Sequence, residues 1–105
     1  MNKKEALKQI KAGNFSLADA DERLKADKEV VLEVVKSYGY DFQYADKSLK
    51  KDKEIVLIAV KFSGDLLQYA DEKLKADKEV VLEAVKNYGG LQYADKSLKK
   101  DKEIV

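Results

Sequence analysis

Carboxylate pairs are the residues of this sequence most able to do chemistry, because the chain contains no histidine and no cysteine. Nucleophilic and general-base catalysis usually depend on Cys, or on Ser with His. Glu29 with Glu33 and Glu79 with Glu83 are the pairs at helical spacing. Both fall on the polar face of a predicted helix, where solvated charge is the ordinary interpretation. We therefore expect no catalytic residue and no enzyme activity.

Metal and cofactor sites are not indicated either. The acidic segment 19–22 suggests the start of a calcium loop, but such a loop then needs an oxygen ligand, a glycine and a glutamate. The chain has Arg23, Leu24 and Val30 at those places. The lack of cysteine also removes thiolate metal ligands and disulfides. We expect no metal and no cofactor.

Tyrosines and lysines that recur along the chain are better candidates, as contacts for a partner. They are Tyr44, Tyr69, Tyr93, Lys36, Lys61 and Lys86. The tyrosines lie off the apolar stripe of their predicted helix, so stacked repeats would arrange them as a ladder. Two interpretations stay open: each ring packs against the neighbouring repeat with its hydroxyl reaching water or a carboxylate, or the rings form a contact surface for a partner protein.

The charge balance restricts the class of partner. Lys and Arg number 21 and Asp and Glu number 20, which gives a formal net charge of +1 with both signs mixed along the chain. Nucleic-acid binders usually cluster basic residues, because phosphate contacts supply much of their affinity, so nucleic acid is a disfavoured partner. The sequence has neither a secretory signal nor an apolar run of membrane-spanning length. We expect a cytoplasmic protein without a transmembrane segment.

An internal repeat of about 25 residues organises the chain. Asp-Lys-Glu begins at Asp27, Asp52, Asp77 and Asp101. A longer period lies over the short one, because YADKSLKKDKEIV occurs identically at 44–56 and 93–105, and LKADKEVVLE at 24–33 and 74–83. Self-similarity at a period between about 20 and 50 residues is typical of solenoids and repeat arrays.

Each repeat is predicted to form two short helices. The second begins at a capping Asp such as Asp27, continues through Lys36, and stops at a glycine; the equivalent glycines are Gly39, Gly64 and Gly89. The first runs approximately over residues 42–49, with Asp41 or Asp65 as the N-cap. Charges spaced by four, such as Asp46, Lys50 and Glu54 or Asp71, Lys75 and Glu79, are expected to pair locally.

We predict an all-α fold, an α-solenoid of short helix-turn-helix repeats of about 25 residues, because a lone repeat buries too little apolar surface to fold and must stack on neighbours. The expected parts of this single unit are an N-terminal helix over 1–13 that can cap the array, repeats over 14–39, 40–64 and 65–89, and a truncated fourth repeat over 90–105. The truncated repeat would leave an open apolar C-terminal face. A homo-oligomer or a head-to-tail filament through that face is therefore an expected assembly.

The segments YADKSLKKDKEIVLIAVKFSG and LQYADEKLKADKEVVLEAVKNYG resemble a helical repeat family catalogued as domain of unknown function 4116. The resemblance spans roughly residues 15–105, and the Tyr-Ala-Asp, Leu-Lys and Asp-Lys-Glu-Val-Val-Leu blocks keep the family's order and spacing. The first repeat departs from it, since Asp19 stands where later repeats have Tyr44 and its equivalents. The resemblance implies a helical array with an interaction role and supplies no catalytic residue.

The leading functional hypothesis is a non-catalytic helical repeat scaffold that mediates protein-protein interaction or self-assembly. The alternative is electrostatic binding of an anionic polymer or a membrane surface, because Lys36, Lys61 and Lys86 would align along the stack. The near-zero net charge argues against the alternative.

Overall fold

The computed structural model describes residues 1–102, and every regular element in that part is helical. The longer helices are α1 (Lys3–Lys11), α3 (Lys28–Ser37), α5 (Lys53–Phe62) and α7 (Lys78–Lys86). One-turn α-helices precede three of them: α2 (Glu22–Lys25), α4 (Lys47–Lys50) and α6 (Glu72–Lys75). The 3-10 helices are η1 (Leu17–Asp19), η2 (Gly39–Tyr44), η3 (Gly64–Tyr69), η4 (Leu91–Tyr93) and η5 (Leu98–Lys100).

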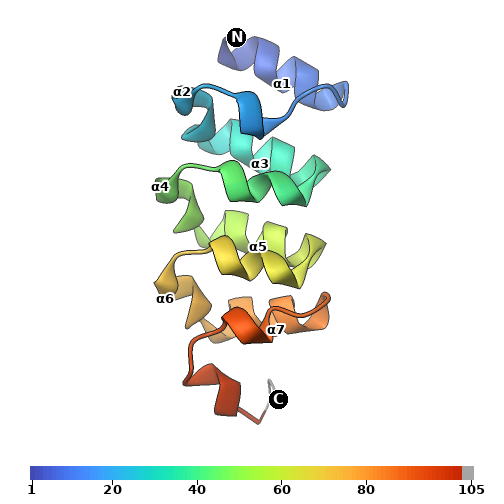
Figure 1. Cartoon of the computed structure of the whole chain (residues 1–105). Helices are drawn as coiled ribbons and strands as arrows, with labels where there is room; N and C mark the ends of the chain where they lie inside the picture. The colour runs from blue at the N-terminus through green and yellow to red at the C-terminus, as the bar shows by residue number, and fades with distance from the viewer. Residues whose placement is uncertain (103–105) are drawn as a thin grey trace.

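These elements stack as layers along one axis, in a molecule that measures 46 × 22 × 18 Å (Figure 1). The long helices form one row, and the 3-10 helices η1 to η4 form a second row in front of it (Figure 1). The one-turn helices lie along one edge with the N-termini of the following long helices, and we call this the capping edge. At the opposite edge, the turn edge, each long helix passes into the next 3-10 helix. The prediction of an all-α solenoid of short repeats is confirmed.

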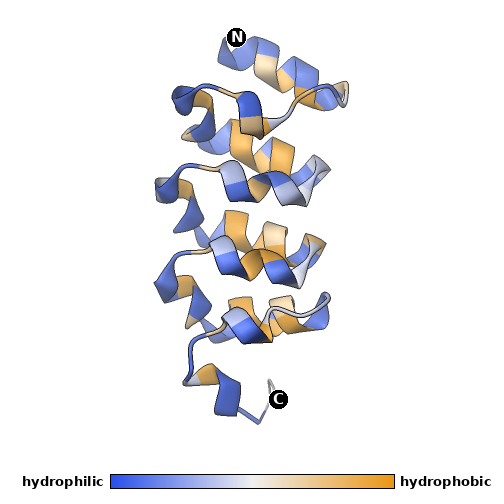
Figure 2. Ribbon diagram, viewed as in Figure 1, coloured by the Kyte–Doolittle hydropathy of each residue, from blue (hydrophilic) through white to orange (hydrophobic). Residues whose placement is uncertain are grey.

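The long helices begin where the sequence predicts, at aspartates that cap free amides. Asp27 Oδ1 accepts from the Val30 amide at 3.1 Å, and Asp52 and Asp77 cap α5 and α7 in the same way. Four apolar residues on two successive turns of α3 are then fully or almost fully buried, namely Val30, Val31, Val34 and Val35. They cover two sides of the helix, so α3 packs against the long helices of both neighbouring layers, α1 and α5, and against η2. Figure 2 shows apolar segments on the long helices of successive layers.

The predicted first helix of each repeat is not one helix. The chain is extended at Ala45 and Asp46, between η2 and α4. The Asp46 amide donates to the Lys25 carbonyl of the preceding repeat at 3.0 Å, and the amides of Asp71 and Asp95 repeat this bond to the next two layers. Because that donor is used between layers, it is not available to a helix running through residues 42–49. Asp46 caps α4 with its side chain instead.

Asp41 and Asp65 are not N-caps, contrary to the sequence prediction. Asp41 is 4% exposed, and its Oδ2 accepts from the Leu17 amide of the preceding layer at 2.8 Å. Asp65 accepts from the Ser63 hydroxyl at 2.5 Å. Both carboxylates therefore serve contacts at the turn edge rather than a helix start.

Gly39 and Gly64 do not end the long helices by a left-handed turn, because their φ angles are not positive. Both are needed because a neighbour approaches closely: a Cβ on Gly39 would overlap the Phe62 ring, and a Cβ on Gly64 would overlap the Ala84 carbonyl. Gly89, with φ +100°, is the one of the three predicted stop glycines that is left-handed. The helix ends are thus fixed by packing between layers.

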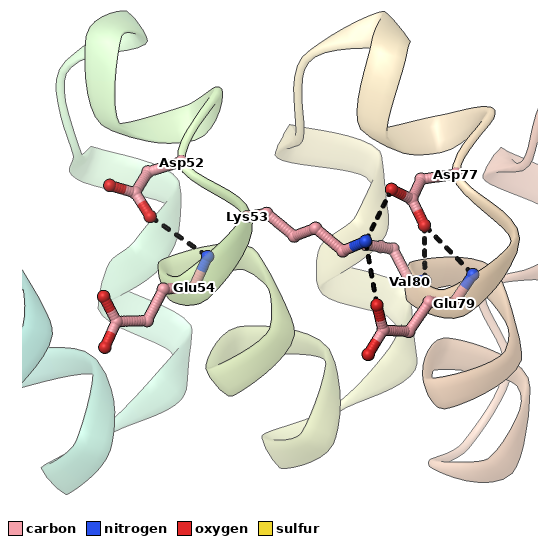
Figure 3. Close-up of polar contacts among 6 residues, drawn as sticks. All are labelled: Asp52, Lys53, Glu54, Asp77, Glu79 and Val80. Carbon is pink, nitrogen blue, oxygen red and sulfur yellow. Dashed lines mark hydrogen bonds and ion pairs between the residues drawn. The ribbon is translucent and has the colours of Figure 1, made fainter.

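An ion-pair clamp at the capping edge joins successive long helices. Lys53 Nζ lies 2.9 Å from Asp77 Oδ2 and 2.8 Å from Glu79 Oε1, so one ammonium bridges two carboxylates of the next helix (Figure 3). The same contact occurs twice nearer the N-terminus, where Lys28 bridges Asp52 and Glu54, and Lys3 bridges Asp27 and Glu29. The Asp-Lys-Glu triplet is therefore a joint between layers.

The predicted local charge pairs are mostly replaced by this clamp. Glu54 and Glu79 pair with lysines of the preceding long helix, not with Lys50 and Lys75. Lys50 donates to the Gln43 carbonyl at 2.8 Å instead. Four-residue spacing favours a local pair only on a continuous helix, and the chain turns between these residues.

The clamp shifts the pKa values of its groups. Partial burial raises the pKa of Asp52, but the hydrogen bonds from the Lys28 ammonium and the Ile55 amide outweigh it, and the net pKa lies below the ordinary 3.8. The pKa values of Asp27 and Asp77 are lowered in the same way. The hydrogen bond to Asp52, followed by that to Glu54, raises the pKa of Lys28 above 10.5.

Helix α1 differs from the later long helices in being apolar on one side only. At the positions of the buried Val30 and Val34 of α3, it carries Glu5 and Gln9. Gln9 Nε2 donates to Glu5 Oε1 at 2.9 Å on the surface. That α1 caps the array remains a prediction, and this one-sided composition supports it.

We expect Gly64→Ala to be more destabilising than Gly39→Ala. The added methyl at 64 meets only backbone atoms, from the carbonyls of Ala84 and Gly89. At 39 it meets Cβ and the nearest ring carbons of Phe62, and of these the ring can rotate away although Cβ cannot. Overpacking of this kind costs about 1–3 kcal/mol, and Gly64→Ala should fall in that range. Urea unfolding of both variants measures the difference. A larger loss for Gly39→Ala would contradict this account.

Asp52→Ala should cost about 1–2 kcal/mol, because it removes an N-cap together with one carboxylate of the clamp. Asp52→Asn keeps an oxygen for the amides of Glu54 and Ile55, so most of the stability should remain. Chemical unfolding of the two variants separates capping from charge. Equal losses would show that the ion pair, and not the cap, is the larger contribution.

Stability should fall below pH 3.8 and stay nearly constant through neutral pH. The clamp aspartates have pKa values lowered from 3.8, so their contribution is complete above that pH and is lost as pH falls through the lower folded values. The clamp lysines have pKa values raised from 10.5, so their contribution is present below 10.5 and is lost only above it. Unfolding curves of the wild type and of the triple Asp27→Asn, Asp52→Asn, Asp77→Asn variant test the acid part. The triple variant should show a shallower loss, and an unchanged acid loss would rule the clamp out as its cause.

Candidate functional site

The predicted tyrosines end the 3-10 helices η2, η3 and η4 and differ in exposure. Tyr44 is 40% exposed, whereas Tyr69 and Tyr93 are half-buried and pack against the apolar core. Lys50 Nζ lies 5.9 Å from the centroid of the Tyr69 ring, within the range of a cation-π contact. Burial lowers the pKa of Lys50, and the nearby Lys47 ammonium lowers it further. Tyr69 is thus partly used in packing between layers, and a partner contact by these tyrosines remains a prediction.

The predicted lysines lie in the last turns of the long helices, at the turn edge. All three are exposed, namely Lys36, Lys61 and Lys86. Lys36 Nζ lies 3.9 Å from Glu33 Oε1 of its own helix. Lys11 occupies the equivalent position in α1 and was missed because the first helix lacks the Asp-Lys-Glu signal. Packed helices lie about 8–10 Å apart, so these lysines form an open row along the stack. Positive charges near a helix C-terminus also interact favourably with the helix dipole. The lysine row therefore has a structural role as well.

Several of the carboxylates considered for catalysis or metal binding take part in structural contacts. Glu29 and Glu79 belong to the clamp, and Asp21 caps α2 by accepting from the amides of Arg23 and Leu24. Within residues 1–102, no cluster of three or more acids, histidines or cysteines is arranged to hold a metal ion. No helix in the same part of the chain is both long enough and apolar enough to span a membrane.

An aromatic cluster at the turn edge was missed by sequence reasoning. The rings of Tyr38, Tyr40 and Phe62 pack edge to face, with centroids 5.1–6.0 Å apart. They are 54%, 39% and 41% exposed, so the cluster is a surface feature and not part of the core. The predicted second helix stops only at Gly39, which would place Tyr38 inside it. The helix ends one residue earlier, at Ser37, and the ring turns outward.

The three equivalent contacts along the turn edge are built from different side chains. The Tyr38, Tyr40 and Phe62 cluster joins the layers of α3 and α5. In the next contact, the equivalent residues are Ser63, Asp65 and Asn87. There the Ser63 hydroxyl donates to Asp65, and the Gly64 amide donates to the Asn87 carbonyl. In the contact nearest the N-terminus the equivalent residues are Gly13, Phe15 and Ser37.

The turn-edge contact nearest the N-terminus, between the layers of α1 and α3, leaves a hollow of about 380 Å³. Gly13, Phe15 and Ser37 all line this hollow. Ile10 and Val34, each at most 5% exposed, form apolar parts of its wall, and the Asp41 carboxylate also borders it. The turn edge therefore offers an open row of lysines, a surface aromatic cluster and a hollow. Such an edge can bind a segment of another molecule by apolar contact and charge.

The C-terminal repeat gives little support for head-to-tail assembly. Residues 103–105, which the prediction of an open face invokes, lie outside the described part. At the other end, the polar Glu5 and Gln9 of α1 replace the apolar residues on which a further layer would stack. Assembly through these two ends remains a prediction.

Comparison with known proteins identifies the repeat. The sequence model of one family, described as a domain of unknown function (DUF4116), matches residues 4–50, 27–75, 52–91 and 77–105. No curated protein and no solved structure matches the chain significantly. The family matches overlap and together cover almost the whole chain, in step with the layers of the stack. This chain belongs to the family described as domain of unknown function (DUF4116).

Proposed function

We propose that this chain is a non-catalytic helical repeat scaffold that binds a protein partner along its turn edge. The observation that carries the proposal is the contrast between the two edges. The capping edge repeats the same clamp and the same backbone bond from layer to layer. The turn edge changes its side chains at every contact, and its backbone varies as well: φ is positive at Gly13 and Tyr88 but extended at the equivalent Tyr38. Residues that are not needed to build the stack are free to specify a partner.

Exposed aromatic rings support a protein as the partner. Tyr38, Tyr40 and Phe62 are held together by edge-to-face contacts, and Tyr88, at the end of α7, is 89% exposed. Aromatic side chains are enriched among the residues that dominate binding energy in protein interfaces. They bring large apolar area at a low entropic cost, because each has few rotatable bonds.

The lysine row favours the second candidate function, electrostatic binding of an anionic polymer or membrane surface. Lys11, Lys36, Lys61 and Lys86 share one position of the long helices and are exposed. Their charges can add along the stack, although acids such as Glu33 lie beside them. Binding of this kind falls steeply as salt rises, whereas binding through aromatic rings does not.

Retention of a partner from lysate should depend on the aromatic cluster. We expect the double variant Tyr38→Ser, Phe62→Ser to lose at least about 30-fold in affinity, since loss of a hot-spot aromatic costs about 2 kcal/mol or more. The matched control is Tyr44→Ser, which removes an exposed ring from the other end of the same 3-10 helix η2. Quantitative mass spectrometry of proteins retained by the immobilised chains, at low and high salt, measures the effect.

Retention that is indifferent to Tyr38 and Phe62 would exclude the cluster as the binding surface. If retention instead disappeared at high salt and with Lys36→Glu and Lys61→Glu, the electrostatic function would replace the proposed one. Loss in the Tyr44→Ser control alone would move the surface to the tyrosine ladder.

A further inference from the structure

The hollow at the N-terminal end of the turn edge has a counterpart in the chain that shows what fills such a space. Residues 13, 15 and 37 are each 25 positions before Tyr38, Tyr40 and Phe62. In the second contact all three positions carry aromatic rings, which pack on one another. In the first contact only Phe15 is aromatic, because Gly13 and Ser37 stand in place of the other two.

The missing rings account for the hollow. Gly13, Phe15 and Ser37 line it, and Ile10 and Val34 behind them are almost fully buried. Its volume of about 380 Å³ lies within the range of roughly 300–1,000 Å³ typical of small-ligand pockets. Tyr38 stands at its border with 54% of its surface exposed, so one ring is already placed for an edge-to-face contact with an incoming ring.

Charge around the hollow indicates what flanks that ring. Lys8 and Lys11 occupy the last turn of α1, beside Ile10, which lines the hollow. Lys36 precedes Ser37 in α3, and its Nζ also lies 3.9 Å from Glu33 Oε1 of the same helix. Neither Lys8 nor Lys11 makes an ion pair with any residue of the described part. The charge at the hollow itself is negative, because the Asp41 carboxylate borders it. That carboxylate already accepts a hydrogen bond from the Leu17 amide. The surroundings therefore suit acids, while the hollow itself suits an uncharged ring.

We infer that this hollow binds an aromatic side chain from an acidic segment of a partner protein, with the ring completing the contact that Tyr38, Tyr40 and Phe62 make one layer along. The inference rests on the proposed function and names the chemistry of the partner. Acidic residues on either side of the ring pair with Lys8, Lys11 and Lys36. The floor formed by Ile10 and Val34 receives the ring, and Tyr38 packs against it.

A second copy of the chain is a poorer occupant on the same grounds. Its most exposed ring is Tyr88, which follows Lys86 by two residues and is followed by glycines. Insertion of Tyr88 would bring Lys86 toward Lys11 and Lys36, and like charges repel. Charge complementarity therefore favours a different protein.

The test titrates the peptide acetyl-Asp-Glu-Tyr-Glu-Asp-amide into the full chain labelled with 15N. Amide shift changes should be confined to residues 8–17 and 34–41. The same peptide with Ala in place of Tyr should bind at least about tenfold more weakly, which corresponds to about 1.4 kcal/mol. Ser37→Phe, which copies residue 62 into the hollow, should weaken binding of the tyrosine peptide by a similar factor. Asn87→Phe, at the equivalent position of α7, is the matched control and should bind as the wild type does.

A second pair of variants keeps the test valid if Ser37→Phe does not fold. Lys11→Glu with Lys36→Glu changes only exposed side chains and should abolish peptide binding, whereas Lys86→Glu should not. Unchanged binding in both Ser37→Phe and the double lysine variant, or shift changes elsewhere on the chain, would overturn the inference.

Other occupants give distinct results. Shifts of the same residues on raising protein concentration, removed by Tyr88→Ser, would assign the hollow to a second copy and overturn the inference. Shifts produced by single-stranded poly(U) RNA but not by the peptide would do the same in favour of a nucleobase. If the tyrosine peptide did not bind while lysate capture still depended on Tyr38 and Phe62, the inference about the hollow would be overturned and the proposed function would stand. Peptide binding without any lysate capture would leave the hollow assigned and the proposed function unsupported.

Discussion

The whole structure depends on one constraint, that each internal long helix is apolar on two sides. Val30, Val31, Val34 and Val35 of α3 are all buried, and each such side chain contributes about 1.5–3 kcal/mol only when it is covered. One neighbour cannot cover both sides, so a layer is stable only between two other layers. Helix α1 escapes the constraint because it replaces two of these positions by Glu5 and Gln9. The solenoid is therefore required by the pattern of the long helix and not by any single contact.

Apolar burial alone does not fix how the layers are aligned, since valines and leucines pack in many registers. The capping edge supplies the alignment with directional contacts. The bridging lysine needs two carboxylates of the next helix on either side of its ammonium, and the amide of Asp46 needs one particular carbonyl of the preceding layer. Exposed ion pairs contribute only about 0–1 kcal/mol each. Their importance is that a slipped layer would lose all of them together and leave the Asp46 amide without its partner.

The elements predicted well from the sequence are those whose signals are local. Asp27 and the buried valines after it specify a capped helix within ten residues. The repeat of about 25 residues then places the same helix in each following layer. Most predictions that failed concern residues whose partners lie in another layer. Asp41 was expected to cap a helix but bonds to Leu17, and Gly39 was expected as the helix stop but makes room for Phe62. A sequence read one repeat at a time does not contain such partners. The aromatic cluster was missed for the same reason, because Tyr38 fits the buried stripe of an isolated helix and turns outward only when the helix ends at Ser37.

The turn edge shows how much freedom the capping edge leaves. Its three equivalent contacts use a hollow, a cluster of rings and a hydrogen-bonded polar set, yet successive long helices pack on one another at each of them. If the turn edge were needed to hold the stack, these three solutions could not be interchanged. The contacts that align the layers are therefore concentrated at the capping edge, while the residues equivalent to Tyr38, Tyr40 and Phe62 change from layer to layer. A repeat protein built in this way can acquire a binding surface by substitution at a few positions per layer, and a ring replaced by glycine or serine leaves a site of defined shape on a surface that remains rigid.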